Sequence, residues 1–324
     1  MAIVQADVEQ PLLTVAITCY NAEDTIGRAV DCALAQTWTP REIIIVDDGS
    51  TDESAELLRG FERTHDEIRV IRHDSNRGVA EARNTLLAHA NGAFIAFFDD
   101  DDQSASNRLE EQYRKLSEYE LNHPGALVLC YSNRVVTRTG ERHRAFERFG
   151  IGRQPPEPSA SIVADYVLGL FRDDRRHSWG MLGSGTLMAR TQDLRGLDGF
   201  DPRFRRCAER DLAVRAALDG AHFISVDASL VTQYLTPTAD KGGNSDLRYR
   251  LELVKKHRAY LREKGCYAGA WCNMHARFYN GWHWSWRLWY LAALVCFPWP
   301  VSRERLRHSS LLERLHLLPA RPGA

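Results

Sequence analysis

The stretch Phe94-Ile95-Ala96-Phe97-Phe98-Asp99-Asp100-Asp101-Asp102 joins an apolar run directly to four carboxylates. Five apolar residues in a row predict a strand that is covered on both faces, as in a parallel sheet between helices. Four adjacent carboxylates repel one another, and a bound cation lowers that cost. Open parallel sheets bind ligands just beyond the carboxyl ends of their strands, so this acidic run is expected at a ligand site. The alternative is a solvated acidic turn before a helix.

The residues before this stretch alternate short apolar runs with amphipathic segments, which is typical of strand–helix units around a parallel sheet. The predicted strands are residues 12–18, 42–46, 68–72 and 93–98, and the predicted helices are residues 24–36, 78–90, 107–121 and 208–218. A further helix is expected after Thr51 as its N-cap, with Leu57, Leu58 and Phe61 buried. Residues 140–161 are rich in Arg, Pro and Gly and are predicted to form a mobile loop.

A second acidic turn, Asp47-Asp48-Gly49-Ser50-Thr51-Asp52, follows the second predicted strand. Helix capping explains Ser50 or Thr51, and a tight turn explains Gly49. Neither explains the paired Asp47 and Asp48. A carboxylate of this pair can accept hydrogen bonds from a nucleobase or a ribose.

Further candidates follow the first and third strands at the same expected edge of the sheet. Tyr20 and Asn21 end the first strand, and the ring of Tyr20 offers a face on which a base can stack. Arg83 lies about one and a half turns into the helix after the third strand, within reach of a phosphate. Each of these residues alone is as readily a packing or surface residue.

Together these segments resemble the family 2 glycosyltransferases of the GT-A fold, over roughly residues 12–226. The matching motifs are Thr18-Cys19-Tyr20-Asn21, Ile45-Val46-Asp47-Asp48-Gly49-Ser50-Thr51-Asp52, Asn76-Arg77-Gly78 with Ala82-Arg83-Asn84, and Phe97-Phe98-Asp99-Asp100-Asp101. The resemblance implies an α/β, Rossmann-like nucleotide-binding domain with a mostly parallel central sheet and a helical C-terminal extension. It implies a nucleotide-sugar site formed by Thr18, Tyr20, Asn21, Asp48, Arg83, Asp99 and Asp100.

Asp99 and Asp101 match the D-x-D motif of that family, in which the first acid contacts the ribose and the last binds the divalent cation that bridges the diphosphate. We assign both residues to a Mn²⁺ or Mg²⁺ site. The additional acids Asp100 and Asp102 leave a second register of the motif open. Some family members add a His ligand downstream, and none stands at the expected place here, so a third protein ligand also stays open.

The segment Cys207-Ala208-Glu209-Arg210-Asp211-Leu212 resembles the catalytic region of the family, where an E-D pair precedes Asp-Leu. Glu209 takes the place of the aspartate base, and Ala208 replaces the acid before it. The extra methylene of Glu209 moves its carboxylate, and geometry governs general-base catalysis before pKa does. A helix N-terminus that favours acids is the alternative interpretation. Trp179, Gly185 and Asp211 are expected on the acceptor side.

The composition argues against nucleic acid as a partner. The 324 residues carry 42 Lys plus Arg against 43 Asp plus Glu, so no overall field points to nucleic acid. Seven dispersed cysteines without a C-x-x-C pair favour a reducing compartment, and the first residues lack the apolar run of a secretory signal. The expected location is the cytoplasm.

The sequence is expected to form two parts. The first is a catalytic domain, residues 1–240, with a nucleotide-sugar half to about 105 and an acceptor half from about 106. The second is an extension, residues 241–324.

The extension differs from the rest of the chain. Residues 241–324 hold 15 Lys and Arg against 5 Asp and Glu, and six of the eight tryptophans. The apolar stretch 288–301 is shorter than the roughly 20 residues that span a bilayer. A helix that lies in the lipid headgroup region, on the inner face of the membrane, is predicted, with packing against the catalytic domain or an oligomer contact as alternatives.

The resulting hypothesis is a metal-dependent, inverting glycosyltransferase. It moves a sugar from a nucleoside-diphosphate donor, with UDP expected from the family, to a saccharide or lipid-linked acceptor in polysaccharide or glycolipid synthesis. A sugar nucleotidyltransferase is one alternative, although such enzymes usually carry a Gly-rich loop after the first strand. A binding module without catalysis is the other, because the acids around Glu209 depart from the family pattern.

Overall fold

The computed structural model describes residues 10–138, 141–170, 176–235, 244–279 and 284–298. Its contacts divide the chain into two compact units. Unit 1 comprises residues 1–160 and 177–237, and unit 2 comprises residues 161–176 and 238–324. Each unit is described by itself.

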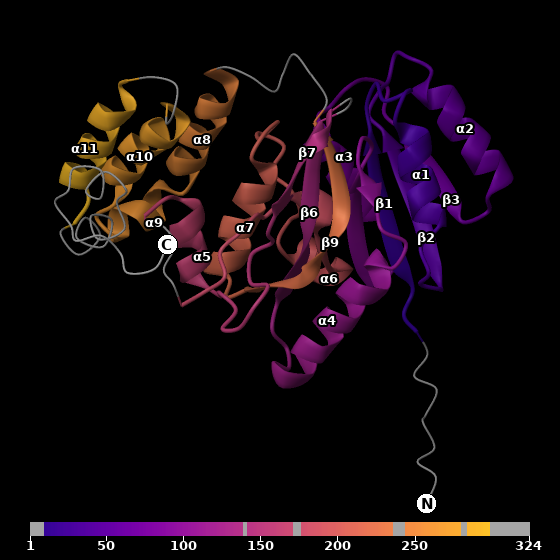
Figure 1. Ribbon diagram of the computed structural model, residues 1–324, viewed down its shortest axis with the longest axis horizontal. Coiled ribbons are helices and arrows are strands. Elements are labelled where there is room, and N and C mark those ends of the chain that lie inside the picture. The colour runs from indigo at the N-terminus through magenta and orange to yellow at the C-terminus, as the bar shows by residue number, and fades with distance from the viewer. Residues whose placement is uncertain (1–9, 139–140, 171–175, 236–243, 280–283, 299–324) are drawn as a thin grey trace, which may run out of the picture. The chain divides into compact units, whose positions relative to one another are not determined.

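Unit 1 is built on one sheet, in which the described strands follow the order β3-β2-β1-β4-β8-β6-β9-β5, with β7 paired to β6. Figure 1 labels β1, β2, β3, β6, β7 and β9 of this sheet. The strands are β1 Leu13–Cys19, β2 Arg41–Asp47, β3 Ile68–Arg72, β4 Phe94–Asp99, β5 Gln103–Ser104, β6 Val128–Arg138, β7 Glu141–Arg148, β8 Met188–Arg190 and β9 His222–Leu235. The pairs β1–β2, β1–β4, β2–β3 and β6–β9 are parallel. The short strand β8 joins the two parallel groups through antiparallel pairs with β4 and β6.

The helices of unit 1 follow the strands in the alternating order that the sequence predicts. They are α1 Ile26–Leu34, α2 Ser54–Thr64, α3 Val79–His89, α4 Arg108–Asn122, α6 Thr191–Gly196 and α7 Ala208–Leu218, with a 3-10 turn at Ser184–Thr186. Apolar residues cover both faces of the central strands, as a parallel sheet between helices requires. Residues Val15, Ala16 and Ile17 of β1, for example, are all fully buried.

Three local predictions were wrong. Residues 140–161 are not wholly a loop, because 141–148 pair with β6 as strand β7. Thr51 does not cap α2: Glu53 holds the cap position, and Asp52 accepts a hydrogen bond from the Ser54 amide. Leu57 is 40% exposed rather than buried. Periodicity locates a helix better than it locates the end or the rim of its apolar face.

Unit 2 is helical in its described part. It contains α5 Ser161–Val167, α8 Asn244–Lys256, α9 Arg258–Glu263, α10 Tyr267–Tyr279 and α11 Trp286–Cys296. Hydrogen bonds from Tyr260 and Lys264 to Asp165 tie α9 to α5, and the Asn273 amide donates to the Gly169 carbonyl. No helix among the described residues is long and apolar enough to cross a membrane.

Candidate active site

The predicted site residues come together at the carboxyl ends of β2, β1 and β4. Thr18 of β1 is in register with Val46 of β2 and with Asp99 of β4. The backbone of Tyr20 donates to the Asp100 carboxylate at 3.1 Å, and the Asp48 amide donates to the Cys19 carbonyl at 2.8 Å. The two acidic turns therefore flank the end of β1. This convergence is what the sequence predicts for a ligand site at this edge.

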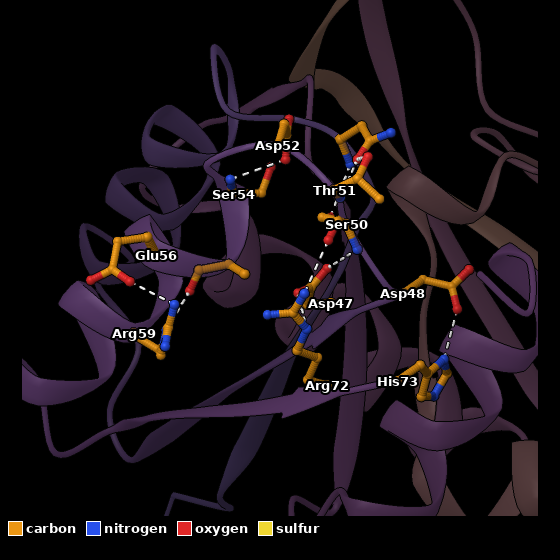
Figure 2. Close-up of polar contacts among 12 residues, drawn as sticks. Asp47, Asp48, Ser50, Thr51, Asp52, Ser54, Glu56, Arg59, Arg72 and His73 are labelled. Carbon is orange, nitrogen blue, oxygen red and sulfur yellow. Dashed lines mark hydrogen bonds and ion pairs between the residues drawn. The ribbon is translucent and has the colours of Figure 1, made fainter. Parts of the chain in front are cut away.

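Asp48 is only 3% exposed and fastens the turn before α3. Its Oδ1 lies 2.7 Å from His73 Nδ1 and accepts the Arg77 amide at 2.9 Å, while its Oδ2 accepts the Gly78 amide at 2.8 Å. Figure 2 shows the contact between Asp48 and His73. Because the ionised Asp48 carboxylate can only accept, His73 donates from Nδ1, and its Nε2 lies 2.9 Å from the Thr85 hydroxyl. A nucleoside contact by Asp48 stays a prediction.

The other residues of this turn hold its shape. The Asp47 carboxylate accepts the Ser50 amide at 2.8 Å and lies 3.4 Å from Arg72 Nε (Figure 2). Asn21, at a positive φ of 48°, donates its amide to Ser50 Oγ and accepts from the Thr51 amide. Asn21, predicted to bind the nucleotide, thus clamps the end of β1 to the acidic turn, while the Tyr20 side chain next to it is 46% exposed.

Asp99 is held at the end of β4 between two other predicted site residues. Its Oδ1 lies 3.4 Å from the guanidinium of Arg83, whose side chain is 8% exposed. On the other side, a Cβ at Gly185 would stand 2.3 Å from Asp99 Oδ2. Only glycine lets the 3-10 turn approach the carboxylate so closely. Arg83, Asp99 and Gly185 therefore form one contiguous group.

The acidic run after Asp99 carries more negative charge than its surroundings balance. Burial, followed by the charge of Asp101, raises the pKa of Asp100 to about 7. Burial, followed by the charges of Asp99 and Asp101, raises the pKa of Asp102 to about 8. Asp102 Oδ1 accepts the Tyr234 amide, whereas its buried Oδ2 has no hydrogen-bond partner among the described residues. A cation bound beside this run would stabilise the ionised carboxylates.

The donor set fits a cation that is shared with a phosphate ligand. The described residues hold no group of three or more His, Cys, Asp or Glu side chains arranged for a metal ion. Mg²⁺ is commonly held by one or two carboxylates, with substrate phosphates and water as the remaining ligands. Asp99 and Asp101 would meet that requirement without a third protein ligand, and the carboxylate oxygen of Asp102 that lacks a partner marks the local excess of acceptors.

The fully buried side chain of Arg108 supports the acidic turn from the interior of the domain. Arg108 is 0% exposed and donates to the Phe97 carbonyl at 2.9 Å, to Ser104 Oγ at 3.0 Å and to Gln112 at 2.9 Å. Burial lowers the pKa of Arg108 to about 10, and the nearby Asp99 and Asp102 oppose that shift. Gln112 in turn donates to the Thr186 carbonyl, next to Gly185. The end of β4 and the 3-10 turn are therefore fixed by one network.

The predicted base, Glu209, lies in the first turn of α7 and is half-buried. The residue before this helix, Cys207, has a left-handed φ of 65°, a strained position for a side chain other than glycine. Asp211 is fully buried and accepts from Arg215 Nε at 2.8 Å, and Arg215 also donates to the carbonyls of Leu197 and Gly199. Asp211, expected on the acceptor side, thus anchors α7 in this structure.

Arg134 of β6 is a site residue that the sequence did not single out. Burial lowers the pKa of Arg134, and the negative charges of Asp99, Asp102 and Glu209 oppose that shift. Its Nη1 lies 3.3 Å from where a Cβ of Gly183 would stand. Its buried Nε has no hydrogen-bond partner among the described residues. Arg134 therefore links the predicted base to the acidic run. A cation in mid-strand carries no sequence signal, whereas His73 directly follows β3, at the same edge of the sheet as the predicted site residues.

Trp179 is less closely tied to this group. It is half-buried, and its ring meets that of His177 edge-on, with centroids 5.7 Å apart. Gly180 beside it lies against the backbone of Phe149 and Gly150. A contact of Trp179 with an acceptor sugar stays a prediction.

The sequence of this chain matches the model of glycosyl transferase family 2 over residues 14–175, half of its length. The chain therefore belongs to that family. It is 38% identical over 109 residues to the putative teichuronic acid biosynthesis glycosyltransferase TuaG of Bacillus subtilis, covering 34% of this chain and 43% of TuaG. It is 30% identical over 155 residues to the UDP-Glc:alpha-D-GlcNAc-diphosphoundecaprenol beta-1,3-glucosyltransferase WfaP of Escherichia coli, covering 48% of this chain and 56% of WfaP. The chain thus matches about half or less of the length of these curated relatives.

Among solved structures, the fold is similar to that of S. aureus TarS 1-349 in complex with UDP-GlcNAc. The TM-score is 0.62 at 16% sequence identity, over 90% of this chain and 83% of TarS 1-349. TarS 1-349 alone gives a TM-score of 0.59 at 15% identity. The predicted α/β fold of the GT-A type is confirmed.

Proposed function

We propose that this chain is a metal-dependent, inverting glycosyltransferase that moves a sugar from a UDP-sugar to a saccharide or lipid-linked acceptor in the synthesis of a cell-surface polysaccharide or glycolipid. The family membership and the relatives TuaG and WfaP support the class of reaction. The observation that carries the proposal is the position of Asp99, between Arg83 and Gly185 at the end of β4, where the turns after β1 and β2 converge.

In this proposal Arg83, Asp99 and Asp101 serve the diphosphate of the donor. Asp99 and Asp101 hold a divalent cation, Mn²⁺ or Mg²⁺, which when bound neutralises the charge of the leaving diphosphate. Arg83 lies beside the same carboxylate and adds a fixed positive charge where negative charge develops. Thr18, Tyr20, Asn21, Asp48 and Asp100 form the nucleoside side of the site.

Glu209 acts on the acceptor. Its carboxylate removes the proton from an acceptor hydroxyl, whose oxygen attacks the anomeric carbon of the donor sugar. The bond from that carbon to the diphosphate oxygen breaks on the opposite side, so UDP leaves and the configuration inverts. The buried guanidinium of Arg134 interacts electrostatically with this carboxylate.

The proposed setting is the cytoplasm, at the inner face of a membrane that carries the acceptor. The seven cysteines support the first part, since none of them is in a disulfide bond. The name of WfaP describes a diphosphoundecaprenol acceptor, which supports a lipid-linked acceptor here.

The test is a donor panel of UDP-, GDP- and dTDP-sugars with the full chain, with and without Mn²⁺. A bound donor raises the melting temperature of the folded protein, and transfer releases a nucleoside diphosphate. Stabilisation by a UDP-sugar that depends on Mn²⁺, followed by release of UDP, is expected. Release of pyrophosphate, or no response to any donor, contradicts the proposal.

A further inference from the structure

One helix of unit 2 presents a continuous apolar face. In and before α11, Trp284 is 72% exposed, Leu288 is 56%, Leu291 is 50% and Val295 is 85%. Residues 288, 291 and 295 are spaced three and four apart, so they lie on the same side of the helix. We call these four side chains the α11 face. Tyr290 and Ala293, on another side of the helix, are buried.

The α11 face is not needed to hold the helix in place. The Trp289 ring stacks on the His275 ring of α10, with centroids 4.1 Å apart and an angle of 14° between them. Near the other end, Phe297 packs so closely on Gly269 of α10 that a Cβ there would lie 2.4 Å from the Phe297 ring. These contacts fix α11 to α10 at both ends. Leu288, Leu291 and Val295 take no part in these two contacts and are therefore available to another partner.

Most other large apolar side chains that are exposed in the described structure are dispersed: Leu57 lies on α2, Leu121 on α4 and Leu218 on α7. The exposed Phe146 and Phe149 lie close together in sequence, but each has an arginine guanidinium over its ring. Single exposed apolar residues are ordinary, whereas a contiguous group marks a binding surface. The α11 face is such a group within twelve residues of chain.

The chemistry around the face selects its partner. Five of the eight tryptophans lie between residues 282 and 299, and the exposed Arg287 lies next to Leu288. From residue 284 to the end, the sequence holds six Arg and no Lys against two Glu. Tryptophan, arginine and leucine side by side suit the boundary between lipid headgroups and acyl chains. The surplus of arginine favours a negatively charged surface.

We propose that the α11 face binds the surface of an anionic lipid bilayer, with its apolar side chains in the headgroup boundary and Arg287 against lipid phosphates. The choice of a lipid surface over a protein rests in part on the proposed function, in which the acceptor is lipid-linked. The exposed face and the charge surplus are independent of that function.

The experiment measures sedimentation of the full-length chain with two kinds of vesicle: phosphatidylcholine alone, and phosphatidylcholine mixed with phosphatidylglycerol. Val295→Glu and the double variant Leu288→Glu with Leu291→Glu place charge on the α11 face. Leu121→Glu is the matched control, because Leu121 is 83% exposed but isolated on α4. The partition coefficient on anionic vesicles is expected to fall at least about tenfold in both α11 variants and to stay at the wild-type value in Leu121→Glu. Added salt weakens wild-type binding.

Three results overturn the proposal: no binding by the wild type, wild-type binding by both α11 variants, or equal loss in the control. A fourth result also overturns it: the wild type does not bind vesicles, and light scattering shows that the α11 variants differ from it in oligomeric state. That result would assign the α11 face to a contact with a second copy of the chain. Val295 is so exposed that its replacement leaves helix packing intact, and thermal unfolding checks this. Transfer to a soluble acceptor is measured in parallel. Unchanged transfer is expected for the variants, while absent transfer in the wild type refutes the proposed function and leaves the vesicle result standing.

Discussion

Replacing Gly185 by alanine tests whether the exact place of the Asp99 carboxylate matters. The new Cβ would stand 2.3 Å from Asp99 Oδ2 and 2.9 Å from its Cγ, whereas ordinary contact begins at 3.4 Å. The backbone at Gly185 is fixed by the Gln112 bond to Thr186, so the carboxylate has to give way by about 1 Å. A displacement of about 1 Å at a reacting group costs roughly a hundredfold in rate.

The fold tolerates this change better than the site does, because the clash is with the end of a side chain rather than with backbone. The assay is kcat/KM for transfer from the UDP-sugar as a function of Mn²⁺ concentration, together with thermal unfolding. We expect about a hundredfold loss of kcat/KM, weaker Mn²⁺ activation and a nearly unchanged melting temperature.

Gly60→Ala is the matched control. Gly60 lies inside α2, and a Cβ there meets nothing within 4 Å. The same substitution should therefore stabilise the helix by about 0.5–1 kcal/mol and leave transfer unchanged. Wild-type kcat/KM and Mn²⁺ response in Gly185→Ala would refute the reasoning, since Asp99 would then act neither on the cation nor on the donor.

Three further predictions follow from the contacts of the site. Glu209→Gln should lower kcat by about 10²–10⁴-fold with unchanged donor affinity by calorimetry, because it removes only the base; activity near wild type would exclude that role. Arg134→Met should reduce transfer at least about tenfold and Arg134→Lys should recover part of it, since the positive charge beside Glu209 and Asp99 is what matters; equal loss in both would point to packing instead. Asp48→Ala should lower the free energy of unfolding in urea by about 3 kcal/mol or more, because His73 and two backbone amides lose their buried acceptor. A loss below about 1 kcal/mol would contradict the role of Asp48 in holding the turn before α3.

The fold and the edge that carries the site were predictable because they depend on local patterns. The apolar run before Asp99 and the paired acids after Val46 mark strand ends, and parallel strands bring their ends together without further information. Helix α7, which carries Glu209, was predicted with its observed bounds, Ala208–Leu218.

What the sequence left out depends on side chains that meet through the fold. The hydrogen bond between His73 and Asp48 forms only when the segment after β3 lies against the end of β2. The same residue pattern in sequence is equally compatible with an Asp48 carboxylate that has no partner in the protein. Arg134 becomes part of the site only because β6 and β8 bring Gly183 beside it. Its position in mid-strand looks the same as that of a surface arginine until the pairing is known.

The central claim is that Asp99 and Asp101 let a divalent cation and a nucleotide diphosphate bind together. Calorimetric titration of UDP into the wild-type chain and into Asp101→Asn, with Mn²⁺ and with a chelator, tests it most directly. Mn²⁺ is expected to tighten UDP binding at least about tenfold in the wild type and to have little effect in Asp101→Asn. Equal UDP affinity in all four titrations would contradict the account.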